Sequence, residues 1–267
     1  KAINLLNPSE EDITFLEIAP HMIFFKDWRD DLRRKFSYTW HFIFERISEQ
    51  FSINTNDLGY LTTEEITESL KEKPDVGIIC NETSFHIKTA IKLAKHNCHL
   101  FIEKPLSHSL KDTKLLLNLV KKKKLTTMIG CDMRFHKCIN EMKKIIDHGD
   151  LGKIISVRAE NGSYLPNWHP WEDYRNSFAS KKNLGGGVVL TLIHEIDYLY
   201  WFFGRINEVS AITGKFSDLE ISVEDFAAIL LRFQKNIVAE VHLDYFQQPE
   251  FRNCKIIGTK GIVYWDS

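Results

Sequence analysis

The stretch Val76–Pro105, which reads VGIICNETSFHIKTAIKLAKHNCHLFIEKP, contains the residues that decide the fold. Its two ends, Val76–Cys80 and His99–Ile102, are short apolar runs, and the first is expected to be buried on both faces of a parallel sheet. Between them, apolar residues recur at i, i+3, i+4 and i+7 from Ile87, with lysines on the other side, which predicts an amphipathic helix. A strand, a helix and a second strand in this order predict an α/β fold.

The alternation of strands and helices extends on both sides of this unit. A helix is expected to begin at Ser107 and Ser109, and Thr126–Gly130 is predicted to be a further strand. Upstream, Ile13–Ile18 is a predicted strand, and the aromatic stretch of residues 21–52 has approximate helical spacing. That stretch is interpreted as one or two helices packed on the sheet, against the alternative of a ligand surface.

After Arg134 the hydrophobic pattern changes to a period of two residues. Ile154–Glu160, Ala227–Phe233 and Ile237–Tyr245 alternate between apolar and polar side chains, and two shorter runs flank the turn at Gly258–Gly261. This period predicts antiparallel strands with one covered face.

The two patterns divide the chain near Cys131–His136. Residues 1–132 are expected to form an incomplete, Rossmann-type domain on a parallel sheet, of the α/β class. Residues 133–267 are expected to form an α+β domain with a largely antiparallel sheet.

The overall composition indicates which partners suit the chain. Its 35 lysines and arginines nearly balance 36 aspartates and glutamates, so no net field favours nucleic acid or an anionic membrane. No apolar run is long enough to span a bilayer. Five cysteines without a C-x-x-C pair are typical of reduced thiols in a cytoplasmic protein rather than of disulfides or a metal site. The expected partner is a small molecule.

A charged tripeptide, Glu103-Lys104-Pro105, directly follows the predicted strand His99–Ile102. In open parallel sheets, ligands bind at the carboxyl ends of strands. A lysine placed there can donate or accept a proton when burial and neighbouring charge shift the pKa of its amine. The alternative is a solvated lysine in a turn, because short motifs are weak without context.

A second candidate site lies in the run Val188–Phe203, which follows three glycines and is apolar on nearly all sides. A single buried helix is expected, and Gly204 ends it. At 100° per residue, its polar residues share one face: Thr191, His194, Glu195 and Tyr198. This stripe needs a wet cleft or matched polar partners. For the histidine, a structural role is the alternative to a catalytic one.

Four motifs, in their order along the chain, resemble the Gfo/Idh/MocA family of NAD(P)-dependent oxidoreductases. They are Asn81–His86, Glu103-Lys104-Pro105, Arg134-Phe135, and the triple glycine that leads to His194-Glu195-Ile196-Asp197. The resemblance runs from about Leu61 to the end of the chain. It implies a Rossmann domain followed by a domain with a largely antiparallel sheet, with the nicotinamide between them. It also implies hydride transfer to or from a sugar, cyclitol or nucleotide-sugar carbinol.

The resemblance further assigns roles to residues. Lys104 and His194 match the catalytic positions beside the reacting carbinol, where they could share the transferred proton. NAD or NADP is the implied cofactor, and the implied cofactor-binding residues are Cys80, Asn81, Thr83, His86, Glu103, Lys104 and Arg134. A homo-oligomer, either a dimer or a tetramer, is implied through the sheet of the second domain.

The connection Gly162–Arg175 is rich in aromatic residues, hydrogen-bonding side chains and prolines. Such a mixture suits a polyhydroxylated carbohydrate substrate, and the stretch resembles that of a subgroup associated with nine-carbon acidic sugars and nucleotide sugars. The expected substrate-binding residues are Tyr164, Trp168, Asp173, Tyr174, Arg175 and Thr191. The alternative is an ordered connection whose tryptophans pack on the sheet.

Three departures from the family pattern limit these expectations. No G-x-G-x-x-G motif is present, so the chain is expected to be a fragment without the glycine-rich strand–turn–helix and without the carboxyl-terminal end, and to be inactive by itself. Thr191 stands one turn before His194, where many relatives carry an aspartate, and it cannot supply a carboxylate to the histidine. Glu82 replaces a common proline.

Two further functions remain open. In the first, the same fold uses NAD in a redox-neutral cycle that processes a sugar. In the second, the chain is a non-catalytic relative that acts through subunit association, which Thr191 and the missing glycines favour.

Overall fold

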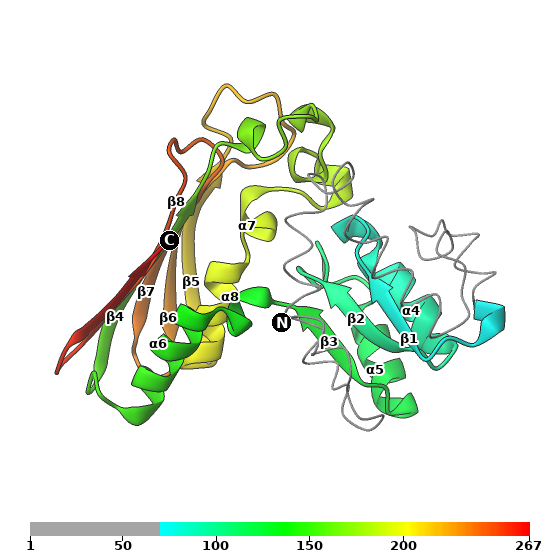
Figure 1. Cartoon of the computed structure of the whole chain (residues 1–267), viewed down its shortest axis with the longest axis horizontal. Coiled ribbons are helices and arrows are strands. Elements are labelled where there is room, and N and C mark those ends of the chain that lie inside the picture. Colours follow the sequence, from blue (N-terminus) through cyan, green and yellow to red (C-terminus); the bar gives the residue numbers. More distant parts are fainter. Residues whose placement is uncertain (1–69) are drawn as a thin grey trace, which may run out of the picture. The chain divides into compact units, whose positions relative to one another are not determined.

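The computed structural model describes residues 70–267 (Figure 1). Residues Lys73–Ser267 form one compact unit, which contains both sheets. The predicted strand at Ile13–Ile18 and the aromatic stretch of residues 21–52 lie outside the described residues.

A three-stranded parallel sheet forms the first part of this unit. In chain order, η3 (Leu70–Glu72) comes before this unit. The elements of the first part are β1 (Val76–Ile79), η4 (Thr83–Phe85), α4 (His86–Lys95), β2 (His99–Glu103), α5 (Thr113–Lys123) and β3 (Thr127–Gly130). The strands lie in the order β1-β2-β3, and all neighbours are parallel. Helix α4 connects β1 to β2, so the predicted strand–helix–strand unit is confirmed.

Two expectations for this part are wrong. Val76 and Ile78 are 42% and 49% exposed, so β1 is buried on one face only. The reason is that α4, with α5 beside it, packs against one side of the strand. The helix expected from Ser107 and Ser109 begins at Thr113, because the left-handed backbone of Asp112, with φ of 60°, cannot continue a helix.

A six-stranded sheet forms the second part of the unit. Its elements are η5 (Asp132–Phe135), α6 (Lys137–His148), β4 (Ile154–Gly162), β5 (Ile206–Gly214), β6 (Phe226–Phe233), β7 (Val238–Asp244), β8 (Phe251–Gly258) and β9 (Ile262–Asp266). The strands lie in the order β5-β6-β7-β4-β8-β9, and only β4 and β7 are parallel neighbours. The expected fold class, a Rossmann-type parallel sheet followed by an α+β part with a largely antiparallel sheet, is confirmed.

Strand β5 is absent from the expectations drawn from the sequence. It lies at the edge of its sheet and pairs only with β6. Residues 207–213 are exposed on both faces of the strand, so its sequence lacks the alternation of apolar and polar side chains that marks a half-buried strand.

The helix expected at Val188–Phe203 is broken into α7 (Val188–Thr191) and α8 (His194–Phe203). Leu192 lies between them with φ of −98° and ψ of 36°, outside the helical range. The carbonyl oxygen of the last residue of α7 accepts a hydrogen bond from Nζ of Lys104 at 2.7 Å. Because of the break at Leu192, α8 begins at His194.

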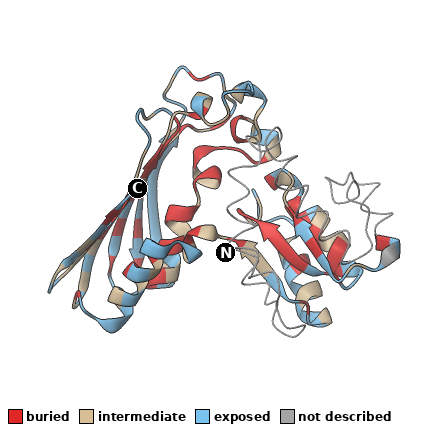
Figure 2. Cartoon of the chain, in the orientation of Figure 1, coloured by how far each residue is buried: buried red, intermediate tan, exposed pale blue. Residues whose placement is uncertain are grey.

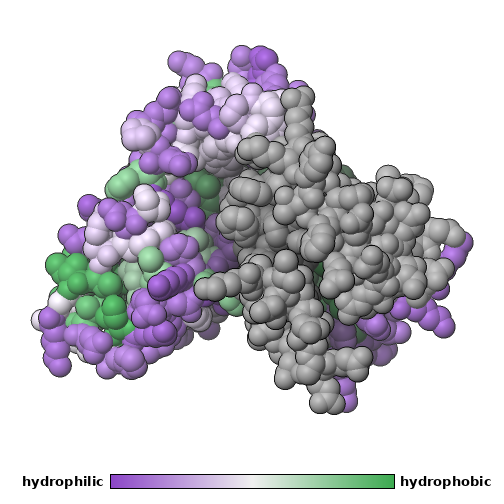
Figure 3. All heavy atoms as spheres, in the orientation of Figure 1, coloured by the Kyte–Doolittle hydropathy of each residue, from purple (hydrophilic) through white to green (hydrophobic). Residues whose placement is uncertain are grey.

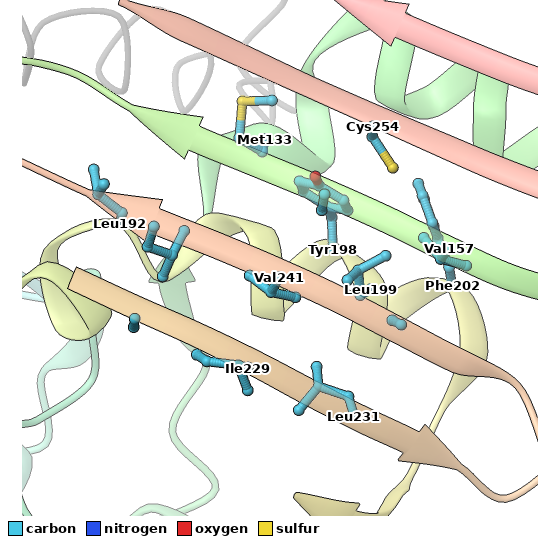
Figure 4. Close-up of a cluster of buried hydrophobic side chains, with 14 of the residues drawn as sticks. Met133, Val157, Leu192, Tyr198, Leu199, Phe202, Ile229, Leu231, Val241 and Cys254 are labelled. Atoms are coloured by element: carbon cyan, nitrogen blue, oxygen red, sulfur yellow. The ribbon is translucent and has the colours of Figure 1, made fainter. Parts of the chain in front are cut away.

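Helices α6 and α8 cover one face of the six-stranded sheet (Figure 1), and the buried residues of this part lie between them and the sheet (Figure 2). Figure 4 shows Tyr198 and Leu199 of α8 beside Ile229 of β6 and Val241 of β7. These four residues are at most 7% exposed. Burial of each such side chain contributes roughly 1.5–3 kcal/mol to folding, so this core fixes α8 on the sheet.

Apolar residues of this part also reach solvent (Figure 3). On the sheet face opposite the helices, Ile212 and Leu230 are 68% and 51% exposed. They line a shallow hollow of about 550 Å³ together with charged residues of β4 and β7, among them Arg158 and Glu240. This face is covered by no helix of the described residues.

Candidate active site

Polar residues gather at the carboxyl edge of the parallel sheet. Asn81 follows β1, Glu103 ends β2 and precedes Lys104, and Asp132 follows β3. Because parallel strands end at the same edge, these side chains come from three neighbouring strands.

The loop after β1 is tied to the loop after β2 by a histidine. His86 is 1% exposed, and its Nδ1 lies 2.8 Å from the carbonyl oxygen of Pro105. Its Nε2 lies 2.9 Å from the carbonyl oxygen of Asn81. His86 thus links the two loops through both ring nitrogens.

Two polar atoms of the loop after β1 provide a test of whether a cofactor fits there. Nδ2 of Asn81 donates to Oγ1 of Thr89 at 3.3 Å. Oδ1 of Asn81 and Oγ of Ser84 are shielded from solvent and have no hydrogen-bond partner within residues 70–267. Buried polar atoms are normally hydrogen-bonded, so these two atoms fit a polar ligand such as a sugar hydroxyl of a dinucleotide.

Glu103 is 8% exposed and pairs across the sheet with Gly130. A Cβ atom built on Gly130 would lie 2.8 Å from Oε2 of Glu103, so any side chain at that position would displace the carboxylate. The glycine that ends β3 therefore makes room for the acidic group that ends β2.

Lys104 is 7% exposed, and its Nζ donates to the carbonyl oxygen of Thr191. The expectation of a buried lysine at a strand end thus agrees with the structure, against a solvated turn. Thr191 is itself 6% exposed and lies beside the hydroxyl of Tyr245. The contact joins the strand-end motif to the residues that precede α8.

His194 lies against a carboxylate that the sequence motifs did not indicate. Its Nδ1 is 3.1 Å from Oδ1 of Asp132, and the two side chains are 9% and 24% exposed. Asp132 lies in η5, at the end of β3 and two residues before Arg134. In the sequence, the position of Asp132 just after a predicted strand is the one feature that could have marked it as a site residue.

An ion pair also joins η5 to α8. Nε and Nη2 of Arg134 donate to the two carboxylate oxygens of Asp197 at 2.8 and 2.7 Å. This bond raises the pKa of the Arg134 guanidinium above its usual value. Burial, followed by the charge of Asp197, raises the pKa of the adjacent Cys131 thiol to about 12.

The one acidic residue of the polar stripe, Glu195, is also paired. Glu195 is completely buried, and its carboxylate accepts from Nε of Arg252 at 2.7 Å and from Nδ2 of Asn161 at 3.3 Å. Tyr198, equally buried, lies against the thiol of Cys254. The stripe therefore meets matched partners from η5, β4 and β8.

The expected substrate residues are not all in one place. Thr191 lies with Lys104, whereas Arg175 is exposed and pairs with Asp173 at 2.8 Å and with Glu220 at 3.4 Å. The three aromatic or phenolic members pack partly against the core of the six-stranded sheet: Tyr164, Trp168 and Tyr174. Nε1 of Trp168 donates to Oγ of Ser163 at 2.7 Å.

The glycine run before α7 lies close to the loop after β1. Gly185 has φ of +82°, and a Cβ atom built on it would lie 2.9 Å from Cβ of Thr83 and 3.0 Å from Cβ of His108. A left-handed backbone and this close approach both require glycine. The glycine run is therefore held near Thr83, one of the expected cofactor residues.

A parallel sheet with polar residues at its carboxyl edge, continued by an α+β part with a largely antiparallel sheet, defines a protein of Rossmann type. Two family models agree with this class: the oxidoreductase family with an NAD-binding Rossmann fold matches residues 28–131, and the GFO/IDH/MocA C-terminal domain matches residues 139–264. The chain belongs to the GFO/IDH/MocA family, and the match begins upstream of Leu61. The expected nicotinamide cofactor is confirmed at the level of the family.

Several curated relatives are dehydrogenases of small polyols and sugars. The chain is 27% identical over 208 residues to the myo-inositol 2-dehydrogenase of Thermotoga maritima, a match that covers 74% of the chain and 59% of the relative. It is 28% identical to the levoglucosan dehydrogenase of Pseudarthrobacter phenanthrenivorans, over 54% of the chain and 37% of the relative. It is 26% identical to the 2,7-anhydro-N-acetylneuraminate hydratase of Mediterraneibacter gnavus, over 73% of the chain and 52% of the relative. The chain thus spans less than two thirds of these relatives.

Solved structures share the fold. GenD2 from gentamicin A biosynthesis, in complex with NAD, superposes with a TM-score of 0.69 at 20% identity, over 83% of the chain and 61% of that protein. The WlbA dehydrogenase of Bordetella pertussis, in complex with NADH and UDP-GlcNAcA, superposes with a TM-score of 0.68 at 20% identity, over 76% of the chain and 63% of that protein.

Within the described range of the chain, no helix has the length and apolar character needed to cross a membrane. All five cysteines are free thiols.

Proposed function

We propose that the full-length protein transfers a hydride between NAD or NADP and a carbinol carbon of a sugar, cyclitol or nucleotide sugar. The observation that carries this proposal is the junction at Thr191, where Lys104 from the strand-end motif reaches the residue that precedes the His194 helix. Membership of the family and the names of its inositol and levoglucosan dehydrogenases support the reaction class.

The cofactor would lie along the carboxyl edge of the parallel sheet. Asn81 and Ser84 offer the unpartnered polar atoms at β1, and Glu103 offers a buried carboxylate at β2 that can accept from ribose hydroxyls. Cys80, Thr83 and His86 would shape the loop, and Arg134 would line the edge from η5. When bound, the nicotinamide supplies the hydride acceptor or donor.

Lys104 and His194 would handle the proton in this reaction. Oxidation of an alcohol requires a base at the hydroxyl oxygen while the hydride leaves from the carbon. Both side chains are shielded from solvent, at 7% exposure for each residue, which favours hydrogen bonds to a bound substrate over bonds to water. Lys104 would accept or donate the proton at the carbinol oxygen, and His194 would share that proton or hold the hydroxyl in place.

The remaining assignments extend this proposal. Tyr164, Trp168, Asp173, Tyr174 and Arg175 would contact the carbohydrate, with Thr191 at the reacting end. The exposed apolar face of the six-stranded sheet would join subunits into a homo-oligomer, and the free cysteines suit a reducing compartment such as the cytoplasm.

A cofactor titration and a substrate panel test the proposal. Full-length protein is titrated with NADH and NADPH, and the cofactor fluorescence is followed. It is then incubated with NAD or NADP and a panel of inositols, anhydro sugars and UDP-sugars, with absorbance of the reduced cofactor as the readout. Binding together with reduction supports the dehydrogenase, and absence of cofactor binding overturns it in favour of a non-catalytic relative.

A redox-neutral reaction is the second candidate, because one relative is named a hydratase of an anhydro sugar. It predicts that a substrate is consumed without net accumulation of reduced cofactor, although the cofactor is required. Mass spectrometry of the product alongside the absorbance record separates the two reactions.

A further inference from the structure

We infer that Asp132 is the positioning residue of His194, and that it supplies the carboxylate which the residue one turn before the histidine, Thr191, cannot supply. The inference rests on the proposed function, since it assigns His194 to proton handling. It moves the acidic partner of the histidine from its own helical segment to the segment that follows β3.

The contact with Asp132 is made at Nδ1 of the ring. Oδ1 of Asp132 lies 3.1 Å from Nδ1 of His194, close enough for a carboxylate to act on that ring nitrogen. A carboxylate at Nδ1 holds the proton on that nitrogen and leaves Nε2 as the nitrogen that can accept a proton. In this proposal, the orientation and the tautomer of the ring are set by a residue outside α8.

The segment that carries Asp132 is itself fixed against α8. Arg134, two residues further along η5, makes the two-bond contact with Asp197, and its carbonyl oxygen accepts from Nδ2 of Asn140 at 2.6 Å. Met133, between the two charged residues, is 6% exposed in the core. The ion pair of Arg134 and the buried side chain of Met133 leave η5 little freedom to rotate away from the histidine.

The other acidic residues of these elements are engaged elsewhere. Glu195 is held by Arg252 and Asn161, and Asp197 is held by Arg134. Within the described residues, the guanidinium of Arg252 interacts with both Glu195 and Asp132, and Lys104 ends at the carbonyl oxygen of Thr191. Within η5 and α8, Asp132 is thus the carboxylate placed at His194.

The tautomer of His194 tests the inference without substrate or cofactor. Full-length protein is labelled with ¹⁵N-histidine, and the His194 signals are assigned by their loss in His194→Gln. The expected result is an imidazole with the proton on Nδ1 in the wild type and a loss of that preference in Asp132→Ala. Asp147→Asn removes an exposed carboxylate of α6 and serves as the control, with His194 signals unchanged.

Steady-state kinetics give a second readout in the isosteric variant Asp132→Asn. We expect kcat to fall by about 100-fold, within the range that a positioned proton-transfer group contributes, with KM nearly unchanged. An unchanged tautomer in Asp132→Ala, or an unchanged kcat in Asp132→Asn, overturns the inference. An Asp132-dependent tautomer in a protein that reduces no substrate supports the pairing and rejects the proposed function instead.

Discussion

Two polar regions of this chain, the residues around His194 and the connection that contains Arg175, organise their charges in different ways. Around His194, each acidic residue meets a partner from a distant segment: Asp132 with His194, Asp197 with Arg134, and Glu195 with Arg252. In the connection, Asp173 and Arg175 are two residues apart and both are exposed.

The difference shows which side-chain pairs depend on tertiary structure for their geometry. A buried, long-range pair forms only when two elements are in place, and removal of one partner leaves a charge without compensation in the interior. An exposed, local pair is screened by water and needs no tertiary structure. The first region is therefore suited to positioning reacting groups, and the second to adaptable contact with a ligand.

The largest expected effect comes from Lys104. In Lys104→Met, the side chain keeps its apolar length and loses its amine, so kcat should fall by about 10²- to 10⁴-fold, the range of a general acid or base. Affinity for NADH should stay nearly constant. Steady-state rates and a fluorescence titration measure both. Turnover close to that of wild type would exclude Lys104 from proton transfer.

Arg252→Met should have the largest effect on stability. It leaves Glu195, which is fully buried, without its cation, and the free energy of unfolding should fall by about 3 kcal/mol. Denaturant unfolding followed by circular dichroism measures this. The double variant Glu195→Gln/Arg252→Met removes the uncompensated charge and should recover part of the loss. Equal stabilities of the single variant and the wild type would contradict a structural role for this pair.

Part of the region around His194 could be singled out from the sequence. Lys104 follows an apolar strand, and His194 lies in a polar stripe of an otherwise apolar helix, so local pattern marked both as candidates, and the resemblance to the family gave them catalytic positions. The contact of Lys104 with the carbonyl oxygen of Thr191 was not predictable, nor was the helix break there. Both depend on a segment distant in sequence.

Asp132 and strand β5 were missed for related reasons. A lone aspartate after a strand carries no periodic signal, and only the packing of η5 on α8 brings it to His194. Strand β5 is an edge strand exposed on both faces, so its sequence has no hydrophobic alternation. Local pattern thus identifies half-buried elements and strand-end groups, whereas tertiary contacts decide partners.

A smaller, pH-dependent effect should come from His242 on the exposed sheet face. Its Nε2 lies 3.0 Å from Oδ2 of Asp244, and this bond raises the pKa of the imidazole, with burial opposing it. A raised pKa in the folded state stabilises the protein below the unfolded value of about 6.5 and ceases to do so as pH rises through the folded value. His242→Asn should therefore be less stable than wild type near about pH 6, with the gap closing near about pH 8.5.

Urea unfolding of both proteins at the two pH values checks this sign. His148→Asn, which alters an exposed histidine at the end of α6, provides the matched control. A gap that widens toward alkaline pH would contradict the assignment of the raised pKa to the bond with Asp244.

The smallest effect should follow from Asp173→Ala in the connection. The pair with Arg175 is local and exposed, so the unfolding midpoint should not change measurably. If the connection contacts the carbohydrate, KM should rise by about 3- to 10-fold, as expected for loss of one hydrogen bond, while kcat stays constant. A fall in kcat with constant KM would instead mean that this exposed pair acts on the reacting groups, and the contrast between the two regions would fail.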